Sequence, residues 1–229
     1  MTDQPGPQHL APTWFLDSDD VRLADFARRA AGEGTMKERV LRLYKAVRDE
    51  VVYDPYGVVL EPFQFKASTT LARRKGFCVT KSALMAACAR AIGVPSRVGY
   101  ADVKNHLTTE RLRKRMGTDV FVFHGYAELH LDGKWVKATP VFNIELCERF
   151  RVLPLEFDGE NDSIFHPFDA DGRRHMEYVK FRGAYDDLPF EEIRRTFHEV
   201  YPYMRTDAPA EKADFAADAA KENAPAAAA

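Results

Sequence analysis

Residues 74–82 read Arg-Lys-Gly-Phe-Cys-Val-Thr-Lys-Ser and place Cys78 at the predicted start of a buried helix. Apolar side chains recur at helical spacing over residues 79–91, and most residues there are good helix formers. Gly93 supplies a C-terminal cap, and Pro95 prevents the helix from continuing. The stretch therefore predicts one helix that begins at a cysteine.

Two interpretations of Cys78 follow from this position. The positive end of a helix dipole favours the thiolate, which is the nucleophilic form, and we expect Lys75 and Lys81 to lower the pKa of the thiol further. Gly76 precedes the helix where a turn or a close backbone approach would need it. The alternative is a small buried cysteine that only packs in the core.

The second informative segment is residues 120–131, which alternates in hydrophobicity as a strand does and carries His124. Phe121, Phe123, Ala127, Leu129 and Leu131 are expected on one face, and Val122, His124, Tyr126, Glu128 and His130 on the other. Asp132-Gly133 predicts a two-residue hairpin turn, with residues 134–139 returning as the next strand.

The hairpin register gives His124 neighbours on its own face. Counting back from the turn places Glu128 opposite Lys137 and makes Thr139 a diagonal neighbour of His124. Asn143 would be the other diagonal neighbour if the strand continued past Pro140. A hydroxyl or an amide in these places could orient the imidazole of a catalytic base. Without such a partner, His124 would be an ordinary strand histidine.

The combination of these segments resembles the transglutaminase-like superfamily, a papain-related group of cysteine enzymes. The resemblance covers about residues 36–150. The matching segments, in order, are Gly76-Phe77-Cys78, Gly93-Val94-Pro95-Ser96-Arg97-Val98, His124-Gly125-Tyr126-Ala127-Glu128 and Asp132-Gly133-Lys134-Trp135-Val136-Lys137-Ala138-Thr139-Pro140. The resemblance implies an α+β domain in which a nucleophile helix packs on an antiparallel sheet, with Cys78 as nucleophile and His124 as base.

The sequence departs from the family pattern at the third catalytic position. Thr139 stands where the family has an aspartate, and a threonine carries no charge to stabilise an imidazolium. Either Thr139 gives weaker support, or Asn143 takes the role, or Asp102 reaches in from a neighbouring strand, or activity is lost. Tyr126 keeps the aromatic character of the family's tryptophan and is a candidate substrate contact.

The oxyanion donor is expected from the segment before the nucleophile. Papain-related enzymes place a side-chain donor there, and Gln64 or Tyr56 could act beside the backbone N–H of Cys78. Either residue could equally be a surface polar side chain without a catalytic role.

Composition excludes several functional classes. The 229 residues carry a net charge of −2 and are 45% hydrophobic, so we expect no nucleic-acid partner. No apolar run approaches the ~18 residues of a membrane span, so we expect no membrane partner either. Residues 1–12 lack the apolar core of a signal peptide. The sequence has only three cysteines, an odd number, which argues against a disulfide framework. A chain without disulfides suits a reducing compartment, so we expect the protein in the cytoplasm.

A metal site is the competing use of the cysteines. Cys78, Cys88 and Cys147 could bind zinc with His124, but the sequence has no Cys-x-x-Cys pair. His166, Asp169 and His175 match no standard metal-site spacing. We therefore predict no metal and no other cofactor, with Cys88 and Cys147 packed in the core.

The predicted organisation has four parts. Residues 1–35 pack on the core, residues 36–150 form the transglutaminase-like core, residues 151–205 complete the same domain, and residues 206–229 form a disordered tail. The predicted function is cysteine-dependent hydrolysis or acyl transfer on the amide bonds of a peptide or protein substrate, through a thioester. The alternative is a catalytically silent module that binds a peptide or protein partner. The sequence does not indicate an oligomeric state.

Overall fold

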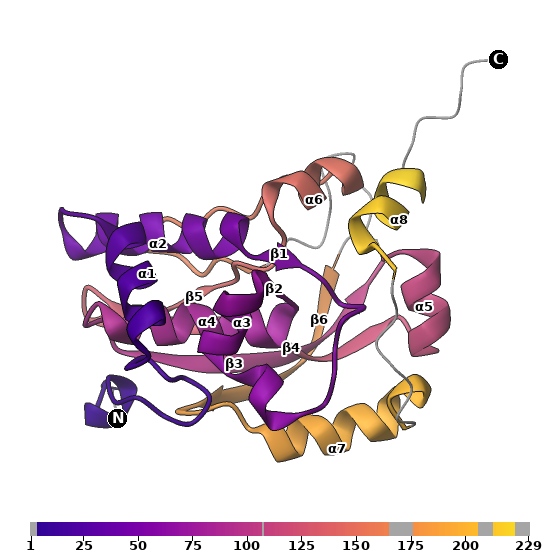
Figure 1. The fold of residues 1–229 in the computed structure, drawn as a ribbon, viewed down its shortest axis with the longest axis horizontal. Helices are drawn as coiled ribbons and strands as arrows, with labels where there is room; N and C mark the ends of the chain where they lie inside the picture. Colours follow the sequence, from indigo (N-terminus) through magenta and orange to yellow (C-terminus); the bar gives the residue numbers. More distant parts are fainter. Residues whose placement is uncertain (1–3, 107, 165–175, 206–212, 223–229) are drawn as a thin grey trace.

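The computed structural model describes residues 4–106, 108–164, 176–205 and 213–222 (Figure 1). Its largest sheet has the strand order β5-β4-β3-β6, and every neighbouring pair is antiparallel. The strands of this sheet are β3 (Ser96–Asn105), β4 (Val120–Leu131), β5 (Lys134–Ala138) and β6 (Met176–Tyr185). A short parallel pair, β1 (Val52–Tyr53) and β2 (Lys75–Gly76), lies just before the cysteine.

Helix α4 (Cys78–Ala91) lies between this sheet and three other helices, α1 (Val21–Ala31), α2 (Met36–Glu50) and α3 (Ala67–Arg73). The other helices are α5 (Glu110–Met116), α6 (Ile144–Phe150), α7 (Phe190–Val200) and α8 (Phe215–Glu222), with 3-10 turns η1 (Pro7–His9), η2 (Pro62–Phe65) and η3 (Pro202–Arg205). Helix α4 packs on β4 and β3 with one side and on α1, α2 and α3 with the other. This sandwich explains why every residue from Cys78 to Arg90 is buried. The predicted helix on an antiparallel sheet is thus confirmed.

Local sequence determines the ends of α4 and the β4–β5 turn. Gly93 has a φ of 85°, and the next N–H, of Val94, donates to the carbonyl of Ala89 at 2.9 Å. Asp132 and Gly133 both have positive φ, 48° and 83°, as a two-residue hairpin turn of this kind requires. The predicted register of the hairpin is confirmed, since Glu128 lies opposite Lys137.

The strand β5 ends at Ala138, before it could place Asn143 beside His124. Its ladder with β4 stops at the pair Ala127 and Ala138, directly before Thr139 and Pro140. The backbone then turns, and Asn143 becomes the N-cap residue of α6. The expectation that Asn143 could be a strand neighbour of His124 is therefore wrong, because proline cannot donate to the ladder.

The C-terminal part of the chain packs on the core. Strand β6 lies beside β3, and the rings of α7 reach the region before the cysteine, with Phe190 5.0 Å from Phe65 and Phe197 6.4 Å from Phe77 between centroids. Residues 215–222 were expected in a disordered tail but form α8, because Phe215 is buried among aromatic side chains. The remainder of that tail lies outside the described residues.

Candidate functional site

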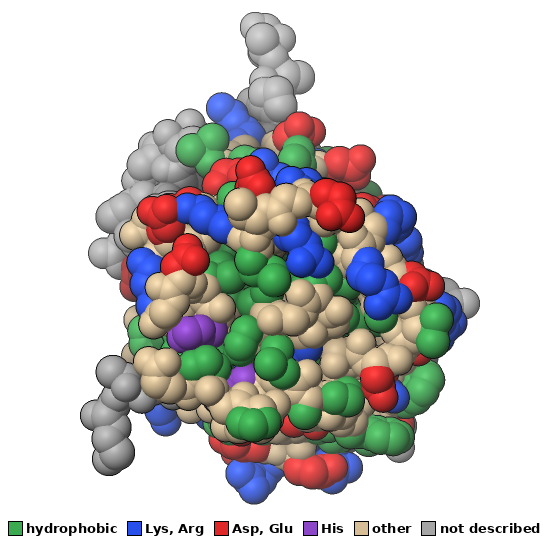
Figure 2. Space-filling view, turned by 90° about the vertical axis from the view of Figure 1, so that its left-hand side faces the viewer, with side chains coloured by type: hydrophobic (Ala, Val, Ile, Leu, Met, Phe, Trp, Pro, Cys, Tyr) green, Lys and Arg blue, Asp and Glu red, His purple; other side chains and the backbone are tan. Residues whose placement is uncertain are grey.

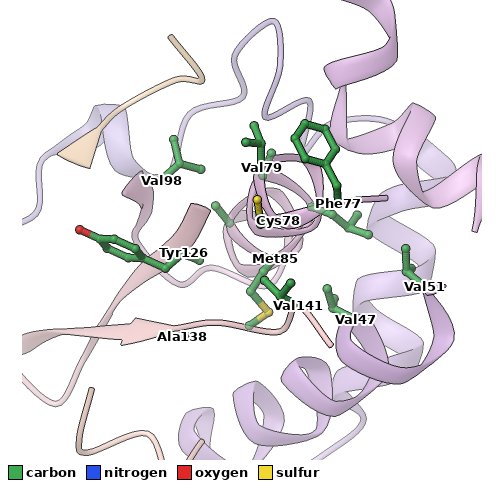
Figure 3. Close-up of a cluster of buried hydrophobic side chains, with 14 of the residues drawn as sticks. Val47, Val51, Phe77, Cys78, Val79, Met85, Val98, Tyr126, Ala138 and Val141 are labelled. Carbon is green, nitrogen blue, oxygen red and sulfur yellow. The ribbon is translucent and has the colours of Figure 1, made fainter. Parts of the chain in front are cut away.

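Helix α4 presents Cys78 in its first turn, directly after a close backbone contact. A Cβ on Gly76 would lie 2.6 Å from Thr80 Oγ1 and 2.9 Å from Thr70 Cγ2, so only glycine fits there without rearrangement. Phe77 follows in an extended conformation as the N-cap residue, and its N–H donates to Thr80 Oγ1 at 3.1 Å. The Cys78 side chain is left 6% exposed, among apolar neighbours that include Val79 and Val141 (Figure 3).

Burial controls the protonation of the Cys78 thiol. It raises the pKa of Cys78 to about 11, although the backbone N–H groups of Gly125, Val79 and Cys78 itself act in the opposite direction. The expected lowering by two lysines is not seen. The Lys75 side chain is 58% exposed and lies 4.0 Å from Asp54, and Lys81 Nζ donates to backbone carbonyls at the end of α2. The thiol is therefore the resting form.

Strand β4 brings the backbone directly after His124 next to Cys78 in space. A Cβ on Gly125 would lie 2.9 Å from the carbonyl oxygen of Cys78 and 3.1 Å from Val79 Cα, so the backbone of β4 touches the first turn of α4 here. The Gly125 N–H is also a hydrogen-bond donor that lowers the pKa of the Cys78 thiol. His124 precedes Gly125 and is 2% exposed. The sulfur thus lies one residue along the strand from the histidine.

The three candidates for the third position each have a hydrogen-bond partner other than the imidazole. Thr139 Oγ1 donates to the carbonyl of Ser163 at 2.8 Å. Asn143 Oδ1 accepts from the backbone N–H of Tyr53 at 3.2 Å. Asp102 accepts two hydrogen bonds from Arg182. These contacts give Thr139 and Asn143 a structural role that explains why both are buried.

The two candidate tyrosines, Tyr56 for the oxyanion and Tyr126 for a substrate contact, have other partners in the structure. Tyr56 Oη is hydrogen-bonded to Thr109 Oγ1 at 2.8 Å and donates to Asp218 Oδ2, on α8, at 2.9 Å. The Tyr126 ring occupies the space that a Cβ on Gly99 would need, and it points away from Cys78 (Figure 3). Strand alternation explains this, because Gly125 faces α4 and its two neighbours along the strand, His124 and Tyr126, lie on the opposite face.

Gln64 is the remaining side-chain donor candidate, and it lies close to the residues around the cysteine. It lies in η2, accepts from Arg73 Nη1 at 2.6 Å through its side-chain oxygen, and lines a cavity of about 20 Å³ together with Phe77 and Thr80. A water molecule needs ~10–15 Å³ of such space, so the cavity has room for about one water and none for a peptide. Cys78 itself does not line this cavity and is only 6% exposed.

Three buried tyrosines around the sulfur were not predicted from the sequence. Burial raises the pKa of Tyr53, Tyr100 and Tyr201 well above the usual value, and the nearby Cys78 raises each of them further. They come from β1, β3 and the residue after α7, so no sequence spacing could have linked them. The Tyr100 hydroxyl is buried with no hydrogen-bond partner among the described residues.

Among the described residues, the other cysteines are not part of a metal site. Cys88 and Cys147 are buried, and burial raises the pKa of Cys147 to about 12. Among the described residues, no three or more His, Cys, Asp and Glu side chains are grouped so that they could hold a metal ion. The predicted positions His166, Asp169 and His175 lie outside the described residues.

The face shown in Figure 2 has no extended patch of side chains of one charge. There, at the end of the molecule opposite α5 and α8, acidic and basic side chains alternate around a patch of apolar ones. In the part of the chain that the structure describes, no helix combines the length and the apolar character needed to span a bilayer.

Comparison with known proteins adds the family. A sequence model of the transglutaminase-like superfamily matches residues 24–140, just over half of the chain. The chain belongs to the transglutaminase-like superfamily. This range contains α4, β4 and β5, and thus Cys78, His124 and Thr139. No curated protein sequence matches the chain.

Two solved structures are similar to the chain. A proposed cysteine protease from Cytophaga hutchinsonii shares 21% identity with a TM-score of 0.44, over 80% of this chain and 55% of its own. The arylamine N-acetyltransferase from Mycobacterium abscessus shares 18% identity with a TM-score of 0.36, over 58% of this chain and 46% of its own. The chain thus spans about half the length of each.

Proposed function

We propose that the protein is a cysteine-dependent hydrolase or acyltransferase that acts on amide bonds of a peptide or protein substrate. One observation carries the proposal: the Cys78 sulfur lies beside the N–H of Gly125, the residue directly after His124. Nucleophilic catalysis requires a base within reach of the thiol, and the strand segment that contacts the Cys78 sulfur carries His124. Membership of a superfamily of cysteine enzymes supports the same assignment.

The proposed reaction has two halves. His124 takes the proton of the Cys78 thiol as the sulfur attacks the amide carbonyl, and the backbone N–H of Cys78 stabilises the negative oxygen of the tetrahedral intermediate. His124 then gives this proton to the leaving nitrogen as the C–N bond breaks, which leaves a thioester on Cys78. Water or an amine attacks the thioester, gives a proton to His124 and restores the thiol. The high thiol pKa makes His124 essential, because few molecules hold a thiolate at neutral pH.

A panel of glutamine-containing peptides tests the proposal. We expect the wild-type protein to release ammonia or a peptide amine, and to link a supplied primary amine if it is a transferase. Cys78→Ala is expected to abolish turnover, and His124→Gln to lower it at least a hundredfold. Cys88→Ala serves as the matched control, because it removes a buried thiol of the same helix away from the site. Turnover that persists in Cys78→Ala would contradict the proposal.

A catalytically silent binding module is the second candidate. Thr139 favours it, because the position that carries a carboxylate in the family here holds a hydroxyl that donates to the Ser163 carbonyl. Binding of a peptide from the same panel with equal affinity by the wild type and by Cys78→Ala, without turnover in either, would select this candidate.

A further inference from the structure

Strand β4 carries one residue more than its neighbour β3 directly before His124. Ala101 lies opposite His124 and Val103 opposite Phe121, so Asp102 alone faces the two residues Val122 and Phe123. This is a β-bulge. Phe123 has a φ of 55°, in the left-handed region where glycine is the usual residue, so the surrounding structure must hold it there.

Two side chains hold Phe123 in this conformation, one from the adjacent strand β3 and one from β6, which lies beyond β3. Asp102 Oδ1, on β3, accepts the backbone N–H of Phe123 at 3.1 Å. Arg182, on β6, donates to the same carboxylate through Nε at 2.6 Å and Nη2 at 2.9 Å. Its guanidinium carbon also lies 4.3 Å from the centre of the Phe123 ring. The two charged side chains are only 11% and 17% exposed, so their mutual geometry is well fixed.

The bulge determines which way the following residues face. A change of one residue in register moves every later side chain of a strand to the other face. With the bulge in place, Gly125 faces α4 and its N–H acts on the Cys78 thiol. Without the bulge, Gly125 and His124 would exchange the faces that they now occupy: the Gly125 position would turn away from α4, and the His124 imidazole would leave its present face.

We propose that Asp102 and Arg182 are positioning residues that maintain the left-handed bulge at Phe123 and thereby set the orientation of the His124 imidazole. The proposal rests on the proposed function, in which His124 is the base. It differs from the use of Asp102 as a third catalytic carboxylate, because the charge of Asp102 is balanced by the bidentate Arg182 and its oxygen binds the backbone. Asp102 then acts by holding the backbone conformation of Phe123, and the negative charge of its carboxylate does not act on the imidazole directly.

The rate of Cys78 alkylation by iodoacetamide, followed by mass spectrometry from pH 6 to 10, tests the proposal. In His124→Gln we expect the rate to rise tenfold per pH unit, as for an isolated thiol with a pKa of about 11, whereas the wild type has an additional His124-dependent rate near neutral pH. Asp102→Ala is expected to lose at least tenfold at pH 7 and to approach the His124→Gln profile. Arg182→Gln should lose less, because Asp102 still accepts the Phe123 N–H.

The deciding variant is Asp102→Ala combined with Phe123→Gly. Glycine adopts positive φ without help, so it should restore the neutral-pH rate to within about threefold of the wild type. A third catalytic carboxylate would not be replaced in this way. Failure of Phe123→Gly to restore the rate, with both variants folded by circular dichroism, would overturn the proposal, and so would an Asp102→Ala profile equal to the wild type.

Failure of the proposed function gives a different result. In that case His124→Gln itself leaves the rate unchanged, while the orientation of the imidazole is still measurable through its NMR signals. Asp102→Ala should shift the His124 ring signals, and Phe123→Gly should return them towards the wild-type positions. Unchanged ring signals in Asp102→Ala would overturn the positioning role independently of catalysis. If Asp102→Ala does not fold, the same comparison in Arg182→Gln, with and without Phe123→Gly, decides the question.

Discussion

At the scale of single residues, the chemistry of Cys78 is decided by burial more than by the helix dipole. A position at the start of α4 favours the thiolate, but the side chain is only 6% exposed and its pKa rises to about 11. The sequence could predict the helix and its first residue, because both follow from local spacing. It could not predict the burial, since this comes from segments distant along the chain, among them β4 and the tyrosines Tyr53, Tyr100 and Tyr201.

Thr139→Asp tests the residue that departs from the family pattern. A carboxylate beside the imidazole stabilises its charged form, so we expect the His124-dependent alkylation rate of Cys78 at pH 7 to rise about tenfold. The same change removes the hydrogen bond to the Ser163 carbonyl at a site that is 1% exposed, and should lower the free energy of unfolding by about 1–3 kcal/mol. Thr139→Val is the control, with the loss of stability but no gain in rate. An unchanged or lower rate in Thr139→Asp would show that this position does not reach His124.

At the scale of elements, Lys81 ties the nucleophile helix to α2. It is fully buried, and its amine donates to the carbonyls of Arg48 at 2.8 Å and Val51 at 2.5 Å. A neutral amine has two N–H donors, which matches these two acceptors. Burial lowers the pKa of Lys81 to about 7, from 10.5. The link between the two helices is therefore sensitive to pH.

The direction in which pH changes stability follows from the protons that Lys81 binds in the folded and the unfolded chain. Between pH 7 and 10.5 the unfolded chain keeps the Lys81 proton and the folded chain has released it, so the contribution of Lys81 to stability rises with pH across this window. Above about pH 8.5 the unfolded chain loses cysteine protons that the buried thiols keep, which lowers stability, so the Lys81 effect is measured between pH 7 and about 8. There, chemical denaturation should show the free energy of unfolding increasing by up to about 1.4 kcal/mol per pH unit. Lys81→Met should remove this slope while lowering stability, because two buried carbonyls lose their donors. A wild-type slope equal to that of Lys81→Met would contradict the prediction.

Elements formed by local signals were predictable, and those formed by distant contacts were not. The Asp132-Gly133 turn and the end of α4 at Gly93 follow from residues that are neighbours in sequence. The bulge at Phe123 depends on Asp102 and Arg182, whose partnership spans 80 positions. The alternation of residues 120–131 therefore predicted a continuous strand and missed the extra residue before His124.

At the scale of the whole molecule, α8 lies over the aromatic side of the site. The Phe215 ring is 5.7 Å from Tyr53 and 5.3 Å from Tyr56 between centroids, and Tyr53 is one of the tyrosines next to Cys78. Asp218 accepts a hydrogen bond from Tyr56 Oη and forms an ion pair with Arg111 at 2.7 Å. An Ala-rich, charged sequence resembles a disordered tail, and the buried Phe215 together with the contacts of Asp218 holds this helix in place.

Removal of α8 should open the site. A chain that ends at residue 205 should label at Cys78 with iodoacetamide at least tenfold faster than the full chain, because Tyr53 and its neighbours lose their cover. Phe215→Ala should reproduce much of this gain, while Lys221→Gln, on an exposed part of α8, should label as the wild type does. Equal rates for the full and the shortened chain would show that α8 does not restrict access.

The central claim is that Cys78 and His124 act together as nucleophile and base, and the rates at which the three cysteines react at pH 7 test it most directly. The account predicts that Cys78 reacts with iodoacetamide at least a hundredfold faster than Cys88 and Cys147, and that His124→Gln reduces the Cys78 rate to near theirs without changing the fold. Equal labelling of all three cysteines, or a Cys78 rate that His124→Gln leaves unaltered, would contradict the account.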